Sequence, residues 1–372
     1  MKRSFRSMLR SIFMRSLYFL TSNISSIIIF CVSISFLGYF GKELHNNNKL
    51  FNLYSKKHEY EELDTKEKSQ EKPFLNGKNQ SFKLYRIIKL SPTVKIFIFS
   101  YPHEYEYLGL GICKHIKFNA SNIEGKIKGK WNNNDDKEKN LKQISRSYTP
   151  VYIDKQKKHV HFIIRVYYPD DEYIDGGKMS IQYIDGGKMS IQLNKLNNND
   201  EIDINGPFGL LEYKGNNELL HLSKSVKIKK HIVMIAGGTG MTPFFRLINH
   251  LLLTKEKELP SDPVYITFIY ANRNENEILL KSIFDDYENR FENFKRVYSV
   301  DKCLNTNQMC NFENIGFINE ELLRKYVLKY EKLNIEVKSK DTLILLCGPP
   351  PMTSSVKSIL KDQLHMENII VF

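Results

Sequence analysis

Apolar residues alternate with polar ones, or run unbroken for a few residues, through the middle of the chain between 81 and 229. Glycine, proline, asparagine or aspartate residues separate these short runs, which are FKLYRIIKL, VKIFIFSY, GICKHIKF, HVHFIIRVYY and EIDING. Each run has the length and alternation of a β-strand. Several short strands at this spacing predict a small antiparallel barrel.

From residue 230 to residue 372 the pattern changes to strands that alternate with helices. The buried-type strands are HIVMIA, VYITFIY, FKRVYSV, DTLILLC and NIIVF, and helical stretches such as EILLKSIFDDYENR and SSVKSILKDQLH lie between them. Such alternation predicts a doubly wound parallel sheet with right-handed crossovers. The expected fold class is therefore α/β plus β, with a barrel at 81–229 followed by an α/β domain at 230–372.

The amino terminus has the pattern of a membrane anchor. Residues 16–40 carry no charge, and this stretch is long enough to cross a bilayer as a helix. We therefore expect a basic segment and anchor helix at 1–41 and a polar linker at 42–80; the alternative is a buried core helix. The positive-inside rule would place the body across the membrane. However, an Arg- and Ser-rich, acid-poor start also resembles mitochondrial targeting signals.

The net charge of +13 suits an acidic protein partner better than a nucleic acid. Residues 1–20 supply five positive charges and no acid, and the remaining excess is spread along the chain instead of forming one stripe. The five cysteines include no CxxC pair. We therefore expect reduced thiols, without a disulfide framework or a metal site.

Two segments interrupt the pattern. A low-complexity stretch between about 121 and 145 contains NNNDDKEKN and is expected to be a surface insertion between two strands. The ten-residue unit YIDGGKMSIQ occurs twice without a gap, at 173–182 and at 183–192. Two such short units do not make a solenoid, so a tandem duplication of one loop is the simplest interpretation. A binding site built for one such loop can hold only one of the two copies.

Four loops carry candidate chemistry. RSYTP at 146–150 lies at a strand end, where an arginine can bind two oxygens of a diphosphate; alone, it is equally typical of an exposed edge strand. GGKMS at 186–190 places glycines before an expected Ser190 N-cap, and the first N–H groups of a helix bind anions. GPFG at 206–209 turns out of a strand. GGTGMTP at 237–243 follows a strand and opens a helix, which is the setting of a dinucleotide cradle.

The order of these motifs resembles that of the NADH–cytochrome b5 reductase family, within the ferredoxin–NADP reductase superfamily. RSYTP, GGKMS and GPFGLLEY are similar to its flavin-domain motifs, and MIAGGTGMTP, YANRNENEILL and LLCGPPPM to its nicotinamide-domain motifs. The resemblance covers about 82–372. It implies a six-stranded flavin-binding barrel that holds FAD, followed by a domain that takes NADH. A hydride would pass to the flavin, and single electrons would leave to cytochrome b5 or a similar acidic haem protein.

The resemblance also implies residue roles at the flavin. Arg146 would hold the diphosphate, Tyr148 would pack against the flavin, and Thr149 would contact the ring near N5. The remaining cofactor residues would be Ile164, Arg165 and Tyr167 on one strand, and Gly187, Lys188, Met189 and Ser190 in the diphosphate loop. The second repeat copy is preferred because Ser190 lies 16 residues before Gly206, as in the family. Gly177 to Ser180 of the first copy are the alternative.

In the nicotinamide domain, Cys347 would lie beside the nicotinamide and assist hydride alignment; the alternative is a buried strand-end thiol. Thr149 and Cys347 are thus the candidate catalytic residues. The other expected cofactor residues are Gly238, Thr239, Thr242, Gly348, Pro349 and Met352. Asp301 matches a family aspartate that faces the adenine ribose, where a carboxylate disfavours the 2′-phosphate of NADPH. Otherwise Asp301 only caps a loop.

Two departures from the family are visible, and other functions remain open. Cys113 stands where the family has glycine, and the asparagine-rich insertion lies near the adenine end of the flavin. The alternatives are a reductase of the same superfamily that serves a quinone or a ferric complex, and a flavin-binding membrane adaptor without turnover. We expect a monomer whose body lies in the cytosol, anchored to the mitochondrial outer membrane or the endoplasmic reticulum.

Overall fold

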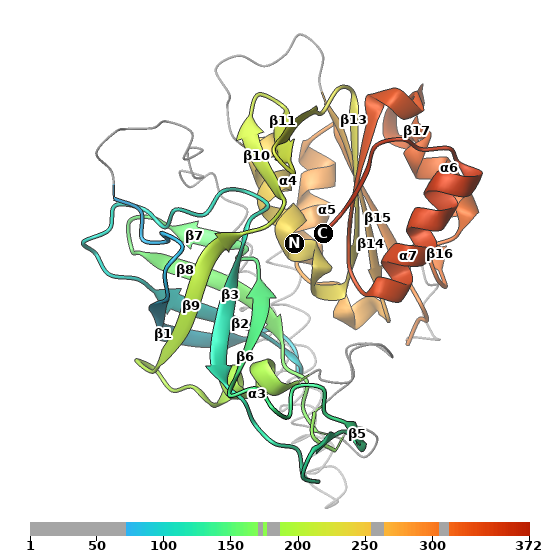
Figure 1. Cartoon of the computed structure of the whole chain (residues 1–372). Coiled ribbons are helices and arrows are strands. Elements are labelled where there is room, and N and C mark those ends of the chain that lie inside the picture. The colour runs from blue at the N-terminus through green and yellow to red at the C-terminus, as the bar shows by residue number, and fades with distance from the viewer. Residues whose placement is uncertain (1–71, 170–173, 177–186, 254–263, 305–311) are drawn as a thin grey trace, which may run out of the picture. The chain divides into compact units, whose positions relative to one another are not determined.

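A computed structural model describes residues 72–169, 174–176, 187–253, 264–304 and 312–372 (Figure 1). The expected anchor and nearly all of the expected linker lie outside these residues. Within the described ranges, every helix is too short or too polar to span a bilayer.

An antiparallel sheet of seven strands forms the first domain, in the order β6-β3-β9-β1-β2-β8-β7. The strands are β1 (Gln80–Lys89), β2 (Val94–Ser100), β3 (His115–Ser121), β6 (Gln143–Tyr148), β7 (Tyr152–Asp154), β8 (His159–Arg165) and β9 (Glu201–Phe208). A barrel-like antiparallel sheet was predicted correctly, but the number of six strands was wrong. The additional strand is β7, whose three residues are too few to give an alternating pattern.

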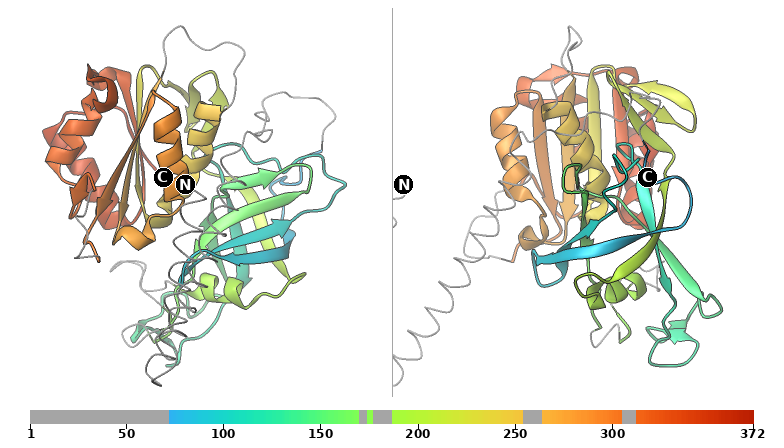
Figure 2. Two further views of the ribbon diagram at one scale, coloured as in Figure 1. Left: turned by 180° about the vertical axis from the view of Figure 1, so that it is seen from behind. Right: turned by 90° about the vertical axis from the view of Figure 1, so that its left-hand side faces the viewer.

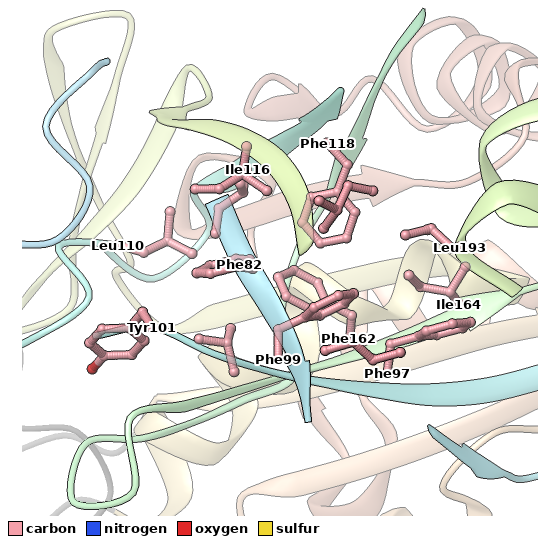
Figure 3. Packing of buried hydrophobic residues seen from close by; sticks show 14 of the residues in the cluster. Phe82, Phe97, Phe99, Tyr101, Leu110, Ile116, Phe118, Phe162, Ile164 and Leu193 are labelled. Atoms are coloured by element: carbon pink, nitrogen blue, oxygen red, sulfur yellow. The ribbon is translucent and has the colours of Figure 1, made fainter. Parts of the chain in front are cut away.

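Phenylalanine side chains fill the interior of this sheet (Figure 3). The ring of Phe99 lies 6.0 Å from that of Phe82 and 5.4 Å from that of Phe118, and Phe118 lies 5.0 Å from Phe162, measured between centroids. The Phe99–Phe118 and Phe118–Phe162 pairs are edge-to-face and the Phe82–Phe99 pair is stacked, and both arrangements add to the stabilisation from burial. Phe74 and Leu75 belong to the same core. The chain therefore joins the barrel before residue 81, where the sequence placed the domain boundary.

A small meander follows the barrel-like sheet and consists of β10 (Leu211–Gly215), β11 (Glu218–His221) and β12 (Lys224–Lys227). The GPFG motif turns out of a strand, as predicted. Gly206 and Pro207 still belong to β9, joined by a cis peptide bond, and the chain turns at Gly209, whose φ is +118°. Only glycine adopts that backbone conformation readily.

Six parallel strands form the second sheet, in the order β16-β15-β14-β13-β19-β20. They are β13 (His231–Gly237), β14 (Tyr265–Asn272), β15 (Phe294–Val300), β16 (Asn314–Ile315), β19 (Thr342–Cys347) and β20 (Ile369–Val371). The predicted parallel sheet is confirmed. The two residues of β16 are too few for a sequence pattern to reveal.

Helices cover both faces of this sheet (Figures 1 and 2). α4 (Thr242–Leu253) and α5 (Lys281–Arg290) lie on one face, and α6 (Glu320–Val327) and α7 (Pro350–Ser358) on the other. The ring of Phe284 in α5 packs 4.7 Å from Phe268 of β14, while Leu323 and Leu360 join the core on the opposite face. Shorter elements are the β17 (Lys329–Tyr330) and β18 (Ile335–Glu336) pair, a π turn at Ile359–Gln363, and 3-10 turns at Gly238–Met241, Glu275–Glu277, Glu331–Leu333 and Ser339–Asp341.

The asparagine-rich insertion lies between β3 and β6, as predicted. It contains a hairpin of β4 (Lys130–Trp131) and β5 (Asn134–Asp135), which Asn132 and Asn133 close with φ values of +49° and +64°. Asparagine tolerates this left-handed conformation better than most residues. The insertion is more than a surface loop, because the Trp131 side chain is buried. We call residues 122–142 the acidic arm after its carboxylates Asp135, Asp136 and Glu138, although its six lysines outnumber its four acidic residues.

The expectation of reduced thiols was wrong for one cysteine. Cys303 is disulfide-bonded, and its partner lies outside the described residues, whereas Cys113 and Cys347 are free. Spacing along the sequence did not indicate this bond, because a disulfide depends on proximity in the fold.

Candidate functional site

The edge strand β6 carries the RSYTP motif. In its pairing with β3, Arg146 lies opposite Phe118 and Tyr148 opposite Ile116. The Tyr148 ring packs 5.0 Å from the Phe118 ring, and burial raises the pKa of its phenol above the usual value. Tyr148 is therefore a neutral, half-buried aromatic surface, and Thr149 follows it directly, also half-buried. This edge is where the family resemblance would place the flavin; the roles of Tyr148 and Thr149 there stay a prediction.

Helix α3 (Lys188–Lys195) begins beside this edge at the second repeat copy. Its N-cap is Gly187, with φ +110°, and within the described chain no side chain caps the N–H groups of the first turn. The predicted cap, Ser190, instead lies inside the first turn. Its hydroxyl donates to Gly187 O and accepts from the N–H of Tyr167. Met189 is buried in the barrel core. The free end of α3 is suited to an anion.

The diphosphate loop combines both repeat copies. Gly176, from the first copy, packs against Gly187, from the second: a Cβ on Gly187 would lie 3.2 Å from the carbonyl carbon of Gly176. Gly176 itself has φ +132°. The described loop thus runs Ile-Asp-Gly from one copy and Gly-Lys-Met-Ser from the other, which together make one complete unit. Gly177 to Ser180, the alternative diphosphate residues, lie outside the described residues.

The two cations expected at the diphosphate are both paired with carboxylates of the acidic arm. Arg146 donates to both oxygens of Glu138, from Nη1 and Nη2 at 2.7 Å each. Lys188, which is fully buried, donates to both oxygens of Asp136 at 2.9 and 2.8 Å. Sequence reasoning missed these contacts, because the acidic run has the composition of a solvated loop.

Three further predicted residues lie at the end of β8 or just after it, and their surroundings differ. The Ile164 side chain packs inside the barrel core, so that only its backbone is available at the edge. Arg165 donates to Glu277 Oε2 at 2.9 Å and to Thr93 Oγ1 at 3.3 Å. Tyr167 is half-buried, and burial raises the pKa of its phenol.

The nicotinamide motifs meet at the carboxyl ends of neighbouring parallel strands. Gly237 ends β13, and Cys347 ends the adjacent β19. A Cβ on Gly237 would lie 2.8 Å from Met352 Sδ and from Pro349 Cδ, so this close contact requires glycine. The packing brings Gly237 and Gly240 against Cys347, Gly348, Pro349 and Met352. Gly238 and Thr239 lie in the 3-10 turn between those two glycines, and Thr242 begins α4. Ligands bind at this edge in open α/β sheets.

Cys347 is a protonated thiol at neutral pH, because burial raises its pKa to about 12. Burial also raises the pKa of Cys113 to about 12, although the nearby Arg246 opposes the effect. Cys113 has φ +73°, a left-handed conformation that explains why a glycine would suit this turn. The side chain does not disrupt the turn, since it is buried.

Asp301 follows β15 at the same sheet edge, and its N–H donates to Asn272 O at 3.0 Å. Partial desolvation raises the pKa of its carboxyl, and the neighbouring Arg273 opposes that shift. Sequence reasoning missed two further candidates here. Asn272 is 6% exposed, and neither amide atom of its side chain has a partner in the described structure. Phe317 is 81% exposed, and Gly316 before it donates to Val300 O. Neither the burial of Asn272 nor the exposure of Phe317 is visible in the sequence.

These residues fit FAD and a nicotinamide nucleotide. The uncapped start of α3 beside Arg146 and Tyr148 suits a diphosphate next to an aromatic ring system. Asn272, with its unpartnered buried amide, leaves hydrogen-bonding capacity for a second ligand at the sheet edge. Fold and site together define a two-domain oxidoreductase that holds a flavin on the barrel-like sheet and a nicotinamide nucleotide on the parallel sheet.

Comparisons with known proteins support this class. Residues 81–213 match the family described as "Oxidoreductase FAD-binding domain", and residues 234–358 match "Oxidoreductase NAD-binding domain". NADH-cytochrome b5 reductase 2 of Xenopus laevis is 31% identical over 272 residues, covering 71% of this chain and 77% of that protein. NADH-cytochrome b5 reductase 3 of Rattus norvegicus is also 31% identical, with 75% of that protein covered. The chain belongs to the NADH–cytochrome b5 reductase family.

The same two domains also occur within longer proteins. Nitrate reductase [NADH] 1 of Oryza sativa subsp. japonica is 31% identical over 267 residues, and this chain spans 25% of its length. The solved cytochrome b5 reductase domain of Ulva prolifera nitrate reductase superposes with a TM-score of 0.62 at 25% identity, covering 81% of this chain and 99% of that domain. The similarity thus concerns the flavin and nicotinamide domains as a unit.

Proposed function

We propose that the protein is an NADH-dependent reductase that passes electrons through FAD to cytochrome b5 or a similar one-electron haem acceptor. The observation that carries the proposal is that one chain contains both nucleotide sites. One lies at the edge of the barrel-like sheet, at β6 and the start of α3. The other lies at the edge of the parallel sheet, where the turns after β13 and β19 are in contact. A flavin adaptor without turnover would have no use for the second site.

When bound, FAD would accept a hydride from NADH and release electrons one at a time. The protein residues position the reactants. Tyr148 and Thr149 offer a neutral, half-buried surface for the flavin, and the uncapped start of α3 receives the diphosphate. Cys347 lies beside the glycine turn of β13, where its neutral thiol packs without adding charge at the hydride path. Catalysis then depends on geometry, because the hydride transfer needs no protein acid or base.

We assign the electron acceptor from the net charge of the chain. A basic chain of net charge +13 attracts an acidic partner, and the family's named acceptor, cytochrome b5, is a haem protein. The test is a flavin spectrum of the purified chain, followed by anaerobic bleaching with NADH and by stoichiometric reduction of cytochrome b5. A quinone and a ferric complex serve as competing acceptors. Turnover of either one at a kcat/KM above that of cytochrome b5 would reject the acceptor.

We further propose that residues 16–40 anchor the protein as a monomer in the mitochondrial outer membrane or the endoplasmic reticulum, with the body in the cytosol. The support is the uncharged stretch itself and the need of the body for cytosolic NADH. Release of the full chain by alkaline carbonate would reject the anchor. Protection of the body from protease in intact organelles would reject the orientation.

A further inference from the structure

Glu138 of the acidic arm lies between the two cations that the flavin diphosphate would use. It receives two parallel hydrogen bonds from the Arg146 guanidinium, and its Oε2 is 3.7 Å from Lys188 Nζ. A carboxylate held in this bidentate way occupies the donors that a phosphate would occupy, because guanidinium groups bind both anions with the same pair of N–H groups. The cationic end of the diphosphate site is thus already neutralised by the chain.

The neighbouring pair of Asp136 and Lys188 has a different character. Both side chains are buried, Lys188 completely, and Lys188 also donates to Asn122 Oδ1 at 3.1 Å and lies over the Trp131 ring. Separating these charges would leave one of them buried and unpaired, which is strongly destabilising. We therefore regard Asp136 as the residue that fastens the acidic arm to α3.

Glu138 can leave its partner without moving the acidic arm. Its backbone is held by three hydrogen bonds. Its carbonyl accepts from Asn122 Nδ2 at 2.7 Å and from the N–H of Leu141 at 2.9 Å, and its own N–H donates to Asp136 Oδ1 at 2.9 Å. Its side chain is 17% exposed and that of Arg146 is 30% exposed, so their ion pair reaches solvent. Rotation of one side chain would therefore free the guanidinium while the arm stays in place.

We propose that Glu138 is a built-in competitor of the FAD diphosphate for Arg146, so that its rotation sets how tightly the protein holds its flavin. The two cations and two carboxylates cancel as they stand, and a diphosphate adds further negative charge. Arg146 therefore binds either Glu138 or the diphosphate. This inference deepens the proposed function, because it requires that FAD binds at the start of α3 beside Arg146.

The test compares three forms of the full chain. Glu138→Gln removes the competing charge. Asp135→Asn is the matched control, because Asp135 lies on the same arm but pairs with Lys139 in solvent. Loss of this partly solvated ion pair should tighten FAD binding about threefold to sixfold. Dissociation constants and release rates follow from the fluorescence of free flavin. Glu138→Gln should also lower the melting temperature without FAD and leave it equal to that of the unaltered protein at saturating FAD, because the lost ion pair and the tighter binding offset each other.

A double-mutant cycle separates competition from a general charge effect. Arg146→Gln should weaken FAD binding, and adding Glu138→Gln to it should bring no further gain. An unchanged or weaker FAD affinity in Glu138→Gln would overturn the proposal, and so would a gain that persists without Arg146 or that Asp135→Asn reproduces. If no form binds flavin at all, the FAD assignment fails, which is a different result from equal binding in all forms.

Discussion

Asp301 is the residue on which nucleotide choice depends in the proposed site. Its carboxylate at the end of β15 would face the 2′-phosphate of NADPH, and like charges a few ångströms apart cost on the order of 1–4 kcal/mol in a partly dry pocket. We predict that Asp301→Ser raises kcat/KM for NADPH at least about fivefold and changes that for NADH little. Steady-state kinetics with both nucleotides measure this.

Arg273 allows a second test of this prediction. It lies close enough to Asp301 to oppose the desolvation that raises the pKa of the Asp301 carboxyl. An arginine at this position can bind a 2′-phosphate once the carboxylate is gone. The gain for NADPH should therefore largely disappear in the double variant Asp301→Ser with Arg273→Gln. If the unaltered protein already uses NADPH as well as NADH, Asp301 has no role in selection.

His231 makes the stability of the parallel sheet sensitive to acid. Its ring is fully buried, with Nε2 2.8 Å from Thr267 Oγ1, and burial lowers its pKa from 6.5 to about 3. The unfolded chain binds the proton near pH 6.5, so the contribution of His231 to stability is complete above that pH and is lost as the pH falls toward 3. Between pH 7 and pH 5 we expect a loss of about 2 kcal/mol from this residue.

Urea unfolding at the two pH values measures this loss. The decrease in unfolding free energy should be smaller in His231→Gln than in the unaltered protein, by about 2 kcal/mol. His103→Gln removes an exposed imidazole and should leave the decrease unchanged. Only the pH-dependent difference is compared, because His231→Gln also loses packing against Tyr330. Equal decreases in all three proteins would contradict the assignment.

Among the elements, the diphosphate loop gives the sharpest test. Because Gly176 and Gly187 are in contact, removing residues 177–186 joins them directly and restores a single Ile-Asp-Gly-Gly-Lys-Met-Ser unit. We predict FAD affinity within about twofold of the original and an unfolding free energy higher by about 1–2 kcal/mol, since closing a ten-residue loop costs entropy. Flavin fluorescence and urea unfolding measure the two quantities.

A longer deletion serves as the control. Removing residues 177–188 takes away Gly187 and Lys188 as well, and should abolish flavin retention. If the ten-residue deletion also lost the flavin, the loop would not be the composite of both copies that the contact between the two glycines indicates.

The elements that the sequence predicted well are those with long, regular patterns. The buried runs of β13, β14, β15 and β19 and the order of the glycine motifs placed the nicotinamide edge correctly. Short strands such as β7 and β16 were not predicted, because two or three residues are too few to show an alternation of apolar and polar positions. The cap of α3 was assigned to Ser190 because serine caps helices often, but Gly187 supplies the left-handed turn.

Contacts between distant segments were the part that the sequence could not predict. Lys188 and Asp136 are 52 positions apart, and the acidic run around Asp136 has a composition typical of a solvated loop. The contact depends on the insertion folding back over α3, which is a property of tertiary packing. The unpartnered amide of Asn272 is likewise visible only once its neighbours are placed.

At the scale of the whole molecule, the net charge of +13 should control the encounter with the acceptor. We predict that the second-order rate constant for reduction of an acidic cytochrome b5 falls about tenfold between about 20 and 200 mM salt, because screening removes electrostatic steering. Stopped-flow measurements on the NADH-reduced protein give this rate. A neutral water-soluble quinone is the control, and its rate should change little. An acceptor rate independent of salt would contradict the assigned charge complementarity.

The contact between Gly176 and Gly187 also has a consequence for heredity. The first half of the loop, up to Gly176, comes from the first copy of the repeat, and the second half, from Gly187, comes from the last copy. Any number of identical units between those two ends supplies the same two halves. Replication slippage that adds or removes a thirty-nucleotide unit should therefore leave flavin binding unaltered, so that alleles of different copy number encode functionally equivalent enzymes.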